Sequence, residues 1–326
     1  MTNGGFMKTP SVAVLIPCYN EALTIGKVVK DFQKELPEAT IYVFDNNSTD
    51  DSATLAAKAG ATVFHEKKQG KGFVVATMLN TIAADYYVMV DGDDTYPADN
   101  ARKLLEPLFL NRADMTVGQR LSTYTMTAFR PLHVFGNRLV VNLINLIFGS
   151  KLSDVMSGYR AFTREVALAL PVVATGFDLE TEMTLQLLYR HCIIQEVPIP
   201  YKERPEGSSS KLSTFRDGIR VLVKILGIFK AYKPLTFFGT LAILALFAGV
   251  FAHSHVVLGV LSGSQNIGLF NMITSAASIL ACLILISAGT IIHTLNFRIL
   301  EMTSVLTKTC QQTKIGQPLT GEKDRS

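Results

Sequence analysis

Short apolar runs typical of strands alternate with helix-like stretches between residue 11 and about residue 211. Most of the segments between the runs repeat their apolar residues with the period of a helix. This alternation predicts an α/β fold with helices on both faces of a mainly parallel sheet. Ligands of such sheets bind beyond the carboxyl ends of the strands, so the residues after each run are the first candidates for a site. The expected strands are residues 12–16, 41–44, 62–64, 86–90 and 115–117.

Two long segments near the C-terminus contain no Asp, Glu, Lys or Arg. Each exceeds the ~20 residues that cross a bilayer. Two buried helices of a soluble domain are the alternative, which the complete absence of charge disfavours. Lysines precede the first segment, Arg298 and Lys308 follow the second, and the connector 262–266 is uncharged. By the positive-inside rule this predicts a transmembrane hairpin with both ends in the cytoplasm. The expected spans are about residues 235–261 and 267–294.

A basic amphipathic stretch precedes the hairpin. Apolar residues recur at helical spacing from Phe215 to Phe229, while Arg216, Arg220 and Lys224 step by four along another face. This pattern predicts a helix that lies on an anionic membrane surface, with a solvated helix of the globular domain as the alternative. The resulting domain organisation is an N-terminal α/β domain, an interfacial helix, two spans and a cytoplasmic tail. Their expected bounds are residues 1–211, 212–233, 234–294 and 295–326.

The composition narrows the class of protein. Hydrophobic residues make up 48% of the chain and charged residues 18%, with a mean hydropathy of +0.27. This is too apolar for a disordered chain and indicates membrane contact. The net charge of +4 is too small for a dedicated nucleic-acid binder, so no nucleic-acid partner is expected. Residues 1–10 lack an apolar stretch, so we expect no cleavable signal peptide and an N-terminal domain that stays in the cytosol.

The four cysteines, at positions 18, 192, 282 and 310, are far apart and form no Cys-x-x-Cys pair. Neither a disulfide framework nor a zinc site is therefore indicated. The first strand is not followed by Gly-x-Gly-x-x-Gly, and no P-loop motif occurs. These absences argue against a dinucleotide-dependent oxidoreductase and a P-loop ATPase.

Polar clusters follow three of the expected strands. Singly, such clusters are ordinary turn and helix-cap chemistry, but together at one sheet edge they indicate a site. The third cluster crowds three carboxylates, which Mg²⁺ or Mn²⁺ would bind while bridging to a diphosphate; a solvated acidic turn is the alternative. The clusters are Pro17-Cys-Tyr-Asn-Glu21, Asp45-Asn-Asn-Ser-Thr-Asp50 and Asp91-Gly-Asp93-Asp94.

Together with two later motifs, these clusters resemble the family 2 inverting glycosyltransferases of the GT-A fold. The resemblance covers residues 11 to about 211 and is strongest to the polyprenyl-phosphate glycosyltransferases, the group of dolichyl-phosphate mannose synthase and the bactoprenol glucosyltransferases. The later motifs are Asp154-Val-Met-Ser-Gly158-Tyr-Arg160 and Arg204-Pro-Glu-Gly-Ser-Ser-Ser-Lys211.

The resemblance implies a donor site for a nucleotide-sugar. Asp91 and Asp93 would engage the ribose and the metal ion, and Thr95 stands where the mannose synthases have a further metal ligand. A Gly/Ser-rich loop with basic ends can also close over a diphosphate on physical grounds, with a flexible linker as the alternative. The residues resembling those that hold the base and ribose are Pro17, Tyr19, Glu21 and Asp45. The residues resembling those that hold the diphosphate are Arg204, with Lys202 as an alternative, and Lys211.

The resemblance also implies an acceptor site for a lipid phosphate. Arg120 resembles an arginine that contacts phosphate. His133 and Asn137 stand where the mannose synthases have an Arg and a Ser four residues apart, and Arg138 follows directly. Residues 139–148 are apolar, as in a core helix or a helix lying against lipid. Asp154 is expected to orient its neighbours, or to act as a base if the acceptor is a hydroxyl.

The candidate catalytic residues are Asp93, Arg120 and Asp154. Glu180 and Glu182, early in an expected helix, are interpreted as stabilisers of the helix dipole.

The sequence thus predicts a multi-pass enzyme of the cytoplasmic membrane that transfers a hexose from a nucleotide-sugar to polyprenyl (undecaprenyl) phosphate. A UDP-hexose is favoured over GDP-mannose, Mg²⁺ or Mn²⁺ is the expected cofactor, and a homo-oligomer is left open. The alternatives are transfer to a hydroxyl of a glycan or glycolipid, and a nucleotide-sugar-binding membrane subunit without turnover. Processive family members use a Gln-x-x-Arg-Trp motif, and the absence of tryptophan disfavours polysaccharide synthesis.

Overall fold

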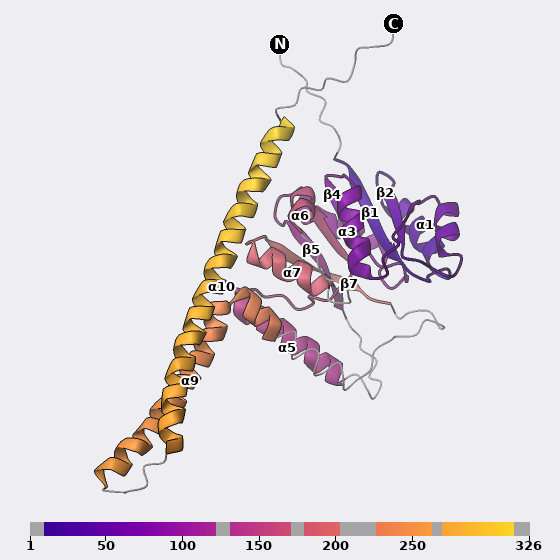
Figure 1. Cartoon of the computed structure of the whole chain (residues 1–326). Helices are drawn as coiled ribbons and strands as arrows, with labels where there is room; N and C mark the ends of the chain where they lie inside the picture. Colours follow the sequence, from indigo (N-terminus) through magenta and orange to yellow (C-terminus); the bar gives the residue numbers. More distant parts are fainter. Residues whose placement is uncertain (1–9, 122–130, 171–178, 203–225, 263–268, 316–326) are drawn as a thin grey trace. The chain divides into compact units, whose positions relative to one another are not determined.

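The computed structural model describes residues 10–121, 131–170, 179–202, 226–262 and 269–315 (Figure 1). The chain forms two compact units, residues 1–218 and 219–326.

The first unit is built on a seven-stranded sheet of order β3-β2-β1-β4-β6-β5-β7. Strand β6 runs antiparallel to β4 and β5, and the other neighbouring pairs are parallel. The predicted α/β architecture is therefore confirmed, and its five expected strands appear as β1 to β5. Strands β6 and β7 were not expected from the pattern. The strands are β1 (Val12–Cys18), β2 (Thr40–Asp45), β3 (Thr62–His65), β4 (Tyr86–Met89), β5 (Met115–Leu121), β6 (Arg160–Thr163) and β7 (Ile194–Pro200).

Helices cover both faces of this sheet. Successive side chains of a strand point to opposite faces, and in β1 Val14 and Ile16 join one core cluster while Leu15 joins the other. Helices α1 and α4 bury their apolar residues in the first cluster, and α3, α6 and α7 bury theirs in the second. The helices are α1 (Ile25–Glu35), α2 (Ser52–Lys58), α3 (Lys71–Thr81), α4 (Ala101–Phe109), α5 (Pro131–Phe148), α6 (Arg164–Ala169) and α7 (Leu179–Tyr189), with a short 3-10 turn at Ala98–Asn100.

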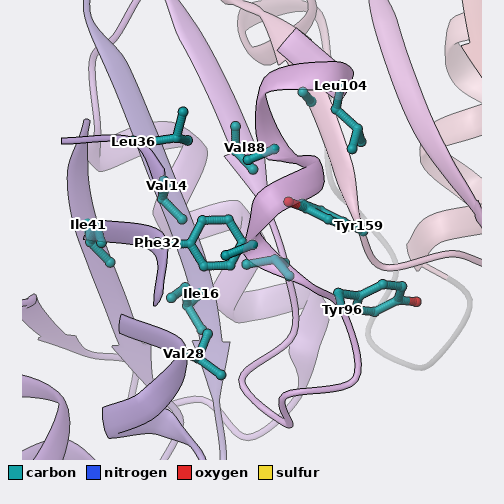
Figure 2. Packing of buried hydrophobic residues seen from close by; sticks show 14 of the residues in the cluster. Val14, Ile16, Val28, Phe32, Leu36, Ile41, Val88, Tyr96, Leu104 and Tyr159 are labelled. Carbon is teal, nitrogen blue, oxygen red and sulfur yellow. The ribbon is translucent and has the colours of Figure 1, made fainter. Parts of the chain in front are cut away.

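The ring of Phe32 in α1 lies in the middle of the first cluster, beside Val14 and Ile16 (Figure 2). It meets Tyr159 edge-on, with ring centroids 6.0 Å apart. Tyr159 belongs to the Asp154–Arg160 motif, so this core contact also fixes a segment expected to carry chemistry.

The second unit contains helices α9 (Pro234–Leu261) and α10 (Leu269–Ile315). Two helical stretches, Pro234–Leu261 and Leu269–Ile299, have a mean hydropathy of 2.2 and are long and apolar enough to cross a membrane. They pack through small residues, since a Cβ added at Gly249 would lie 3.0 Å from Ser278. Residues 226–232 are also helical, whereas most of the expected basic helix, including Phe215 and Arg220, lies outside the described residues.

Phe32→Ala is expected to destabilise the first unit by about 3–5 kcal/mol, because the substitution opens a cavity in a closed core. Phe32 is 1% exposed, whereas Phe109 is 43% exposed, so Phe109→Ala makes the same chemical change at a partly solvated site and is expected to cost much less. Denaturant unfolding of the full chain in detergent, followed by circular dichroism, measures both. Equal losses from the two variants would show that Phe32 does not pack as described.

Candidate active site

The loops after β1 and β2 are joined by hydrogen bonds. The backbone N–H of Thr49 donates to Asn20 Oδ1 at 2.8 Å, and that of Asn20 donates to Ser48 Oγ at 3.0 Å. Asn20 has a φ of 55°, a left-handed conformation that asparagine tolerates better than most residues. The hydroxyl of Thr24 donates to the carbonyl oxygen of Gly92 at 2.6 Å, which ties in the loop after β4. The predicted convergence of the three polar clusters is confirmed.

Asp45 ends β2 and is 4% exposed. Its Oδ2 accepts a hydrogen bond from the backbone N–H of Ser48 at 3.3 Å and lies 3.4 Å from His65 Nδ1. Its Oδ1 is buried and has no hydrogen-bond partner within the part of the chain that the structure describes. A buried acceptor without a donor is costly, so this oxygen is suited to an N–H of a ligand. Tyr19, which is 40% exposed, comes directly after Cys18, the residue of β1 that pairs with Asp45 in the sheet.

Each carboxylate of the cluster after β4 has its own partner. Lys71 Nζ lies 2.6 Å from Asp91 Oδ1, and Lys27 Nζ lies 2.7 Å from Asp94 Oδ1. Asp93, which is buried, accepts hydrogen bonds from the hydroxyl of Thr95 at 2.6 Å and from its backbone N–H at 3.2 Å. Lysine side chains therefore offset part of the repulsion for which the sequence suggested a metal ion.

Asp91 and Asp93 nevertheless suit a divalent cation. Carboxylate oxygens are the ligands that Mg²⁺ and Mn²⁺ prefer, and Mg²⁺ commonly takes one or two carboxylates together with substrate phosphates. Among the described residues, no group of three or more His, Cys, Asp or Glu side chains could hold a metal ion. The residues thus fit a cation that completes its coordination with oxygens of a substrate. The hydroxyl and the backbone N–H of the buried Thr95 both donate to Asp93 Oδ1 and so orient this carboxylate.

Lys71 is a site residue that the sequence analysis missed. It also pairs with Glu180, with Nζ 2.6 Å from Oε1, so Glu180 does more than stabilise a helix dipole. Burial by itself lowers the pKa of Lys71, but the charges of Asp91 and Glu180 raise it above its ordinary value. A signal was present in the sequence, because a lysine at the first position of a helix is unfavourable for the helix dipole.

The Asp154–Arg160 segment forms one wall of the site. The fully buried guanidinium of Arg160 donates to the carbonyl oxygens of Val155 at 2.6 Å and Ser157 at 2.9 Å, and to Thr184 Oγ1 at 2.9 Å. Burial lowers the pKa of Arg160, and these acceptors satisfy its donors. At Gly158 an added Cβ would overlap Oδ2 of Asp91, so only glycine allows this close approach.

Arg120 and Asp154, both expected to be catalytic, form a bidentate ion pair. Nε and Nη2 of Arg120 donate to the two carboxylate oxygens of Asp154 at 2.7 and 2.9 Å. Glu196 holds this pair by accepting from the backbone N–H of Asp154 at 2.6 Å. The orienting role that the sequence analysis gave Asp154 by default is compatible with this ion pair and stays a prediction.

Aromatic rings connect this ion pair to the acidic cluster. The guanidinium carbon of Arg120 lies 5.4 Å from the ring centroid of Tyr201, which packs 5.2 Å from Tyr96. Burial, together with the carboxylate of Asp91, raises the pKa of Tyr96. The Tyr96 oxygen accepts from the backbone N–H of Gly158 at 3.0 Å, so the two candidate subsites share one wall.

The remaining expected site residues are only partly described. Pro17 and Glu21 are half-buried beside Asn20, and Arg138 is exposed on α5. The backbone N–H of Lys202 donates to the carbonyl oxygen of Thr95 at 3.0 Å, so the chain leaves β7 beside the acidic cluster. Arg204 and Lys211, and the side chains of His133 and Asn137, lie outside the described residues.

Comparison with known proteins identifies the family. The sequence family described as Glycosyl transferase family 2 matches residues 13–170. The chain is 37% identical over 246 residues to glycosyltransferase AglJ of Haloferax volcanii, which covers 75% of this chain and 80% of that protein. The chain belongs to glycosyl transferase family 2.

Two further similarities extend this result. The family 2 enzyme is 31% identical over 211 residues to the dolichyl-phosphate hexose transferase of H. volcanii, covering 64% of this chain and 90% of that protein. Its fold resembles that of glucosyl-3-phosphoglycerate synthase from Mycobacterium tuberculosis, crystallised with Mn²⁺, UDP-glucose and glycerol 3-phosphate. That likeness has a TM-score of 0.56 at 20% identity and covers 67% of this chain and 81% of that chain. The GT-A fold expected from the sequence is confirmed.

Gly158→Ala is expected to slow glycosyl transfer about a hundredfold, because the new methyl group displaces the Asp91 carboxylate by a distance comparable to 1 Å. Gly26→Ala is the matched control, since a Cβ there would meet only the carbonyl oxygen of Leu55 at 3.9 Å. Initial rates and thermal midpoints of both variants are compared with wild type. A Gly158→Ala variant with full activity would show that the position of Asp91 is unimportant.

Proposed function

We propose that this glycosyltransferase transfers a hexose from a nucleotide-sugar, preferably a UDP-hexose, to the phosphate of a polyprenyl lipid such as undecaprenyl phosphate. The observation that carries the proposal is the pairing of two subsites along one wall: the acidic cluster from Asp91 to Asp93, and the guanidinium of Arg120 beside Tyr201. An acidic cluster suits a metal-bound diphosphate, and an arginine suits a phosphate acceptor. The similarity to a dolichyl-phosphate hexose transferase and the two long apolar helices support a lipid phosphate as the acceptor.

The surroundings of Asp45 favour uracil as the base. Uracil presents one imide N–H, which a single carboxylate oxygen can accept, whereas guanine presents two adjacent donors that engage both oxygens. Oδ2 of Asp45 is already engaged by Ser48 and lies near His65, which leaves Oδ1 for one donor. Tyr19, exposed at the end of the neighbouring strand, supplies an aromatic surface for the base.

The reaction that this site supports is an in-line displacement with inversion. A phosphate oxygen of the acceptor attacks the anomeric carbon, and the bond from that carbon to the nucleotide diphosphate breaks. A phosphate monoester has a second pKa near ~6 and is largely ionised at neutral pH, so the site needs to position it rather than deprotonate it. Such a site does not need Asp154 as a base, and both carboxylate oxygens of Asp154 accept hydrogen bonds from Arg120. A divalent cation bound by Asp91 and Asp93 would supply charge stabilisation for the leaving diphosphate.

The expected location is the cytoplasmic membrane, with the catalytic unit on the cytoplasmic side. Lys233 precedes the apolar stretch Pro234–Leu261, and Arg298 lies at the end of Leu269–Ile299, which by the positive-inside rule orients both ends inward. Residues 212–233 would lie along the membrane surface between the catalytic domain, residues 1–211, and the hairpin.

A transfer assay tests the acceptor. The full chain in detergent is incubated with radiolabelled UDP-hexoses or GDP-mannose, and with undecaprenyl phosphate, undecaprenol or no lipid. Label is expected in lipid only with undecaprenyl phosphate and a UDP-hexose, reversibly lost with excess chelator, and absent with Asp93→Ala. Transfer to undecaprenol or another hydroxyl would contradict the proposal, as would donor binding without any transfer.

Arg120→Lys is expected to raise the KM for undecaprenyl phosphate about 10- to 100-fold, because lysine cannot reproduce the bidentate contacts of a guanidinium. The affinity for UDP, measured by calorimetry, is expected to change little. Arg112→Lys, the same change at an exposed position just before β5, serves as the control. Loss of UDP affinity with an unchanged KM for the lipid would place Arg120 in the donor site instead.

A further inference from the structure

The loop that carries Asp154 has no helix or strand of its own. Residues 149–159 join α5 to β6 without regular secondary structure. Within this loop, the backbone N–H groups of Ser153 and Asp154 both donate to Oε1 of Glu196, at 2.7 and 2.6 Å. The hydroxyl of Ser153 donates to Oε2 of Glu196 at 2.8 Å. One carboxylate therefore accepts hydrogen bonds from three donors on two consecutive residues.

Glu196 belongs to a different part of the chain from this loop. It lies in β7, the edge strand that pairs with β5. Two consecutive residues of β5 also hold the loop: Gln119 Nε2 donates to Ser153 Oγ at 2.7 Å, and the backbone N–H of Arg120 donates to Asp154 Oδ2 at 3.2 Å. The bidentate contact between the guanidinium of Arg120 and Asp154 is thus built on a loop backbone that β5 and β7 hold together.

We propose that Glu196 is a positioning residue for the acceptor phosphate. Its carboxylate fixes the backbone of Ser153 and Asp154, and the ion pair with Asp154 in turn fixes the guanidinium of Arg120. The inference rests on the proposed function in one respect, that Arg120 contacts the acceptor phosphate. A carboxylate suits this role, because hydrogen bonds from backbone N–H groups to an ionised acceptor are roughly twice as strong as those between neutral groups.

Two variants separate the geometry of this contact from its charge. Glu196→Ala removes all three acceptors, whereas Glu196→Gln keeps a carbonyl oxygen that can accept from both backbone N–H groups. The affinity for farnesyl phosphate, a short polyprenyl phosphate, is measured by calorimetry on the full chain in detergent with UDP present, and farnesol serves as the blank. Glu196→Ala is expected to weaken this affinity about tenfold or more, because a displaced guanidinium loses a hydrogen bond to the phosphate. Glu196→Gln is expected to stay within about threefold of wild type.

The affinity for UDP is expected to change little in both variants, because Glu196 holds the wall that carries Arg120. Glu106→Ala makes the same change at an exposed position on α4 and is expected to alter neither affinity. Equal losses of UDP and farnesyl phosphate affinity in Glu196→Ala would indicate a general structural role and overturn the proposal.

Amide hydrogen exchange measures the loop directly. The peptide that contains Ser153 and Asp154 is expected to exchange at least about tenfold faster in Glu196→Ala, because both amide groups lose their acceptor. In Glu196→Gln it is expected to exchange at close to the wild-type rate. An unchanged rate in Glu196→Ala would show that Glu196 does not fix this loop.

A double-mutant cycle tests whether Glu196 acts through Asp154. In an Asp154→Asn background, adding Glu196→Ala is expected to weaken farnesyl phosphate binding by less than about threefold further, because the two changes disturb the same contact. Fully additive losses would overturn the proposal. If Glu196→Ala does not fold, Glu196→Asp keeps the charge on a shorter side chain and is expected to show the same selective loss, and wild-type behaviour of that variant would overturn the proposal. A wild-type chain that binds UDP but no farnesyl phosphate would instead refute the proposed acceptor, while the exchange rates would still decide whether Glu196 fixes Asp154.

Discussion

The compensation of buried negative charge organises the catalytic unit. The carboxyl end of β4 carries Asp91, Asp93 and Asp94 within four residues, and α7 brings Glu180 to the same place. Such carboxylates remain charged in a folded interior only if cations or hydrogen-bond donors face them. Lys27 from α1 and Lys71 from α3 provide the cations, so helices on both faces of the sheet supply charges to one edge.

The Asp154–Arg160 segment contacts both the hydrophobic core and this edge of the sheet. Tyr159 packs on Phe32 in the core. On one side of it in the chain, Gly158 lies against the carboxylate of Asp91. On the other side, Arg160 donates hydrogen bonds to carbonyl oxygens of the segment itself. The same segment begins with Asp154, which orients Arg120. One short stretch of chain therefore positions both candidate subsites, and a disturbance of its packing is expected to affect donor and acceptor together.

The outer surface of α5 carries exposed apolar side chains. Val140, Val141 and Ile144 are buried, whereas Leu139 and Leu146, seven residues apart, are exposed on the helix. The sequence left a core helix and a helix lying against lipid as alternatives for this stretch, and the described part of α5 is only partly buried, with leucines exposed on its outer side. An exposed apolar stripe on the catalytic unit is compatible with an acceptor whose phosphate is polar and whose chain is hydrocarbon.

The amino-acid sequence by itself determined the features that depend on local periodicity: the five strands β1 to β5, the two apolar helices, and the polar clusters after β1, β2 and β4. Each is encoded by neighbouring residues, because strand alternation, span length and turn chemistry are properties of short segments. Strand β6 was not predicted because it is only four residues long and begins with a buried arginine, Arg160. The guanidinium of Arg160 donates to carbonyl oxygens of the preceding loop and to a side chain of α7.

The pairing of charges was decided only by the tertiary structure. Lys71 and Glu180 are 109 positions apart, and Arg120 and Asp154 are 34 positions apart, so no local pattern shows that they meet. Sequence reasoning accordingly found Arg120 and Asp154 as separate residues, missed Lys71, and took Glu180 for a helix-end charge. Motif spacing identifies which side chains can do chemistry, but the packing of helices against a sheet determines which charge faces which, because that depends on distances between elements that the chain does not connect directly.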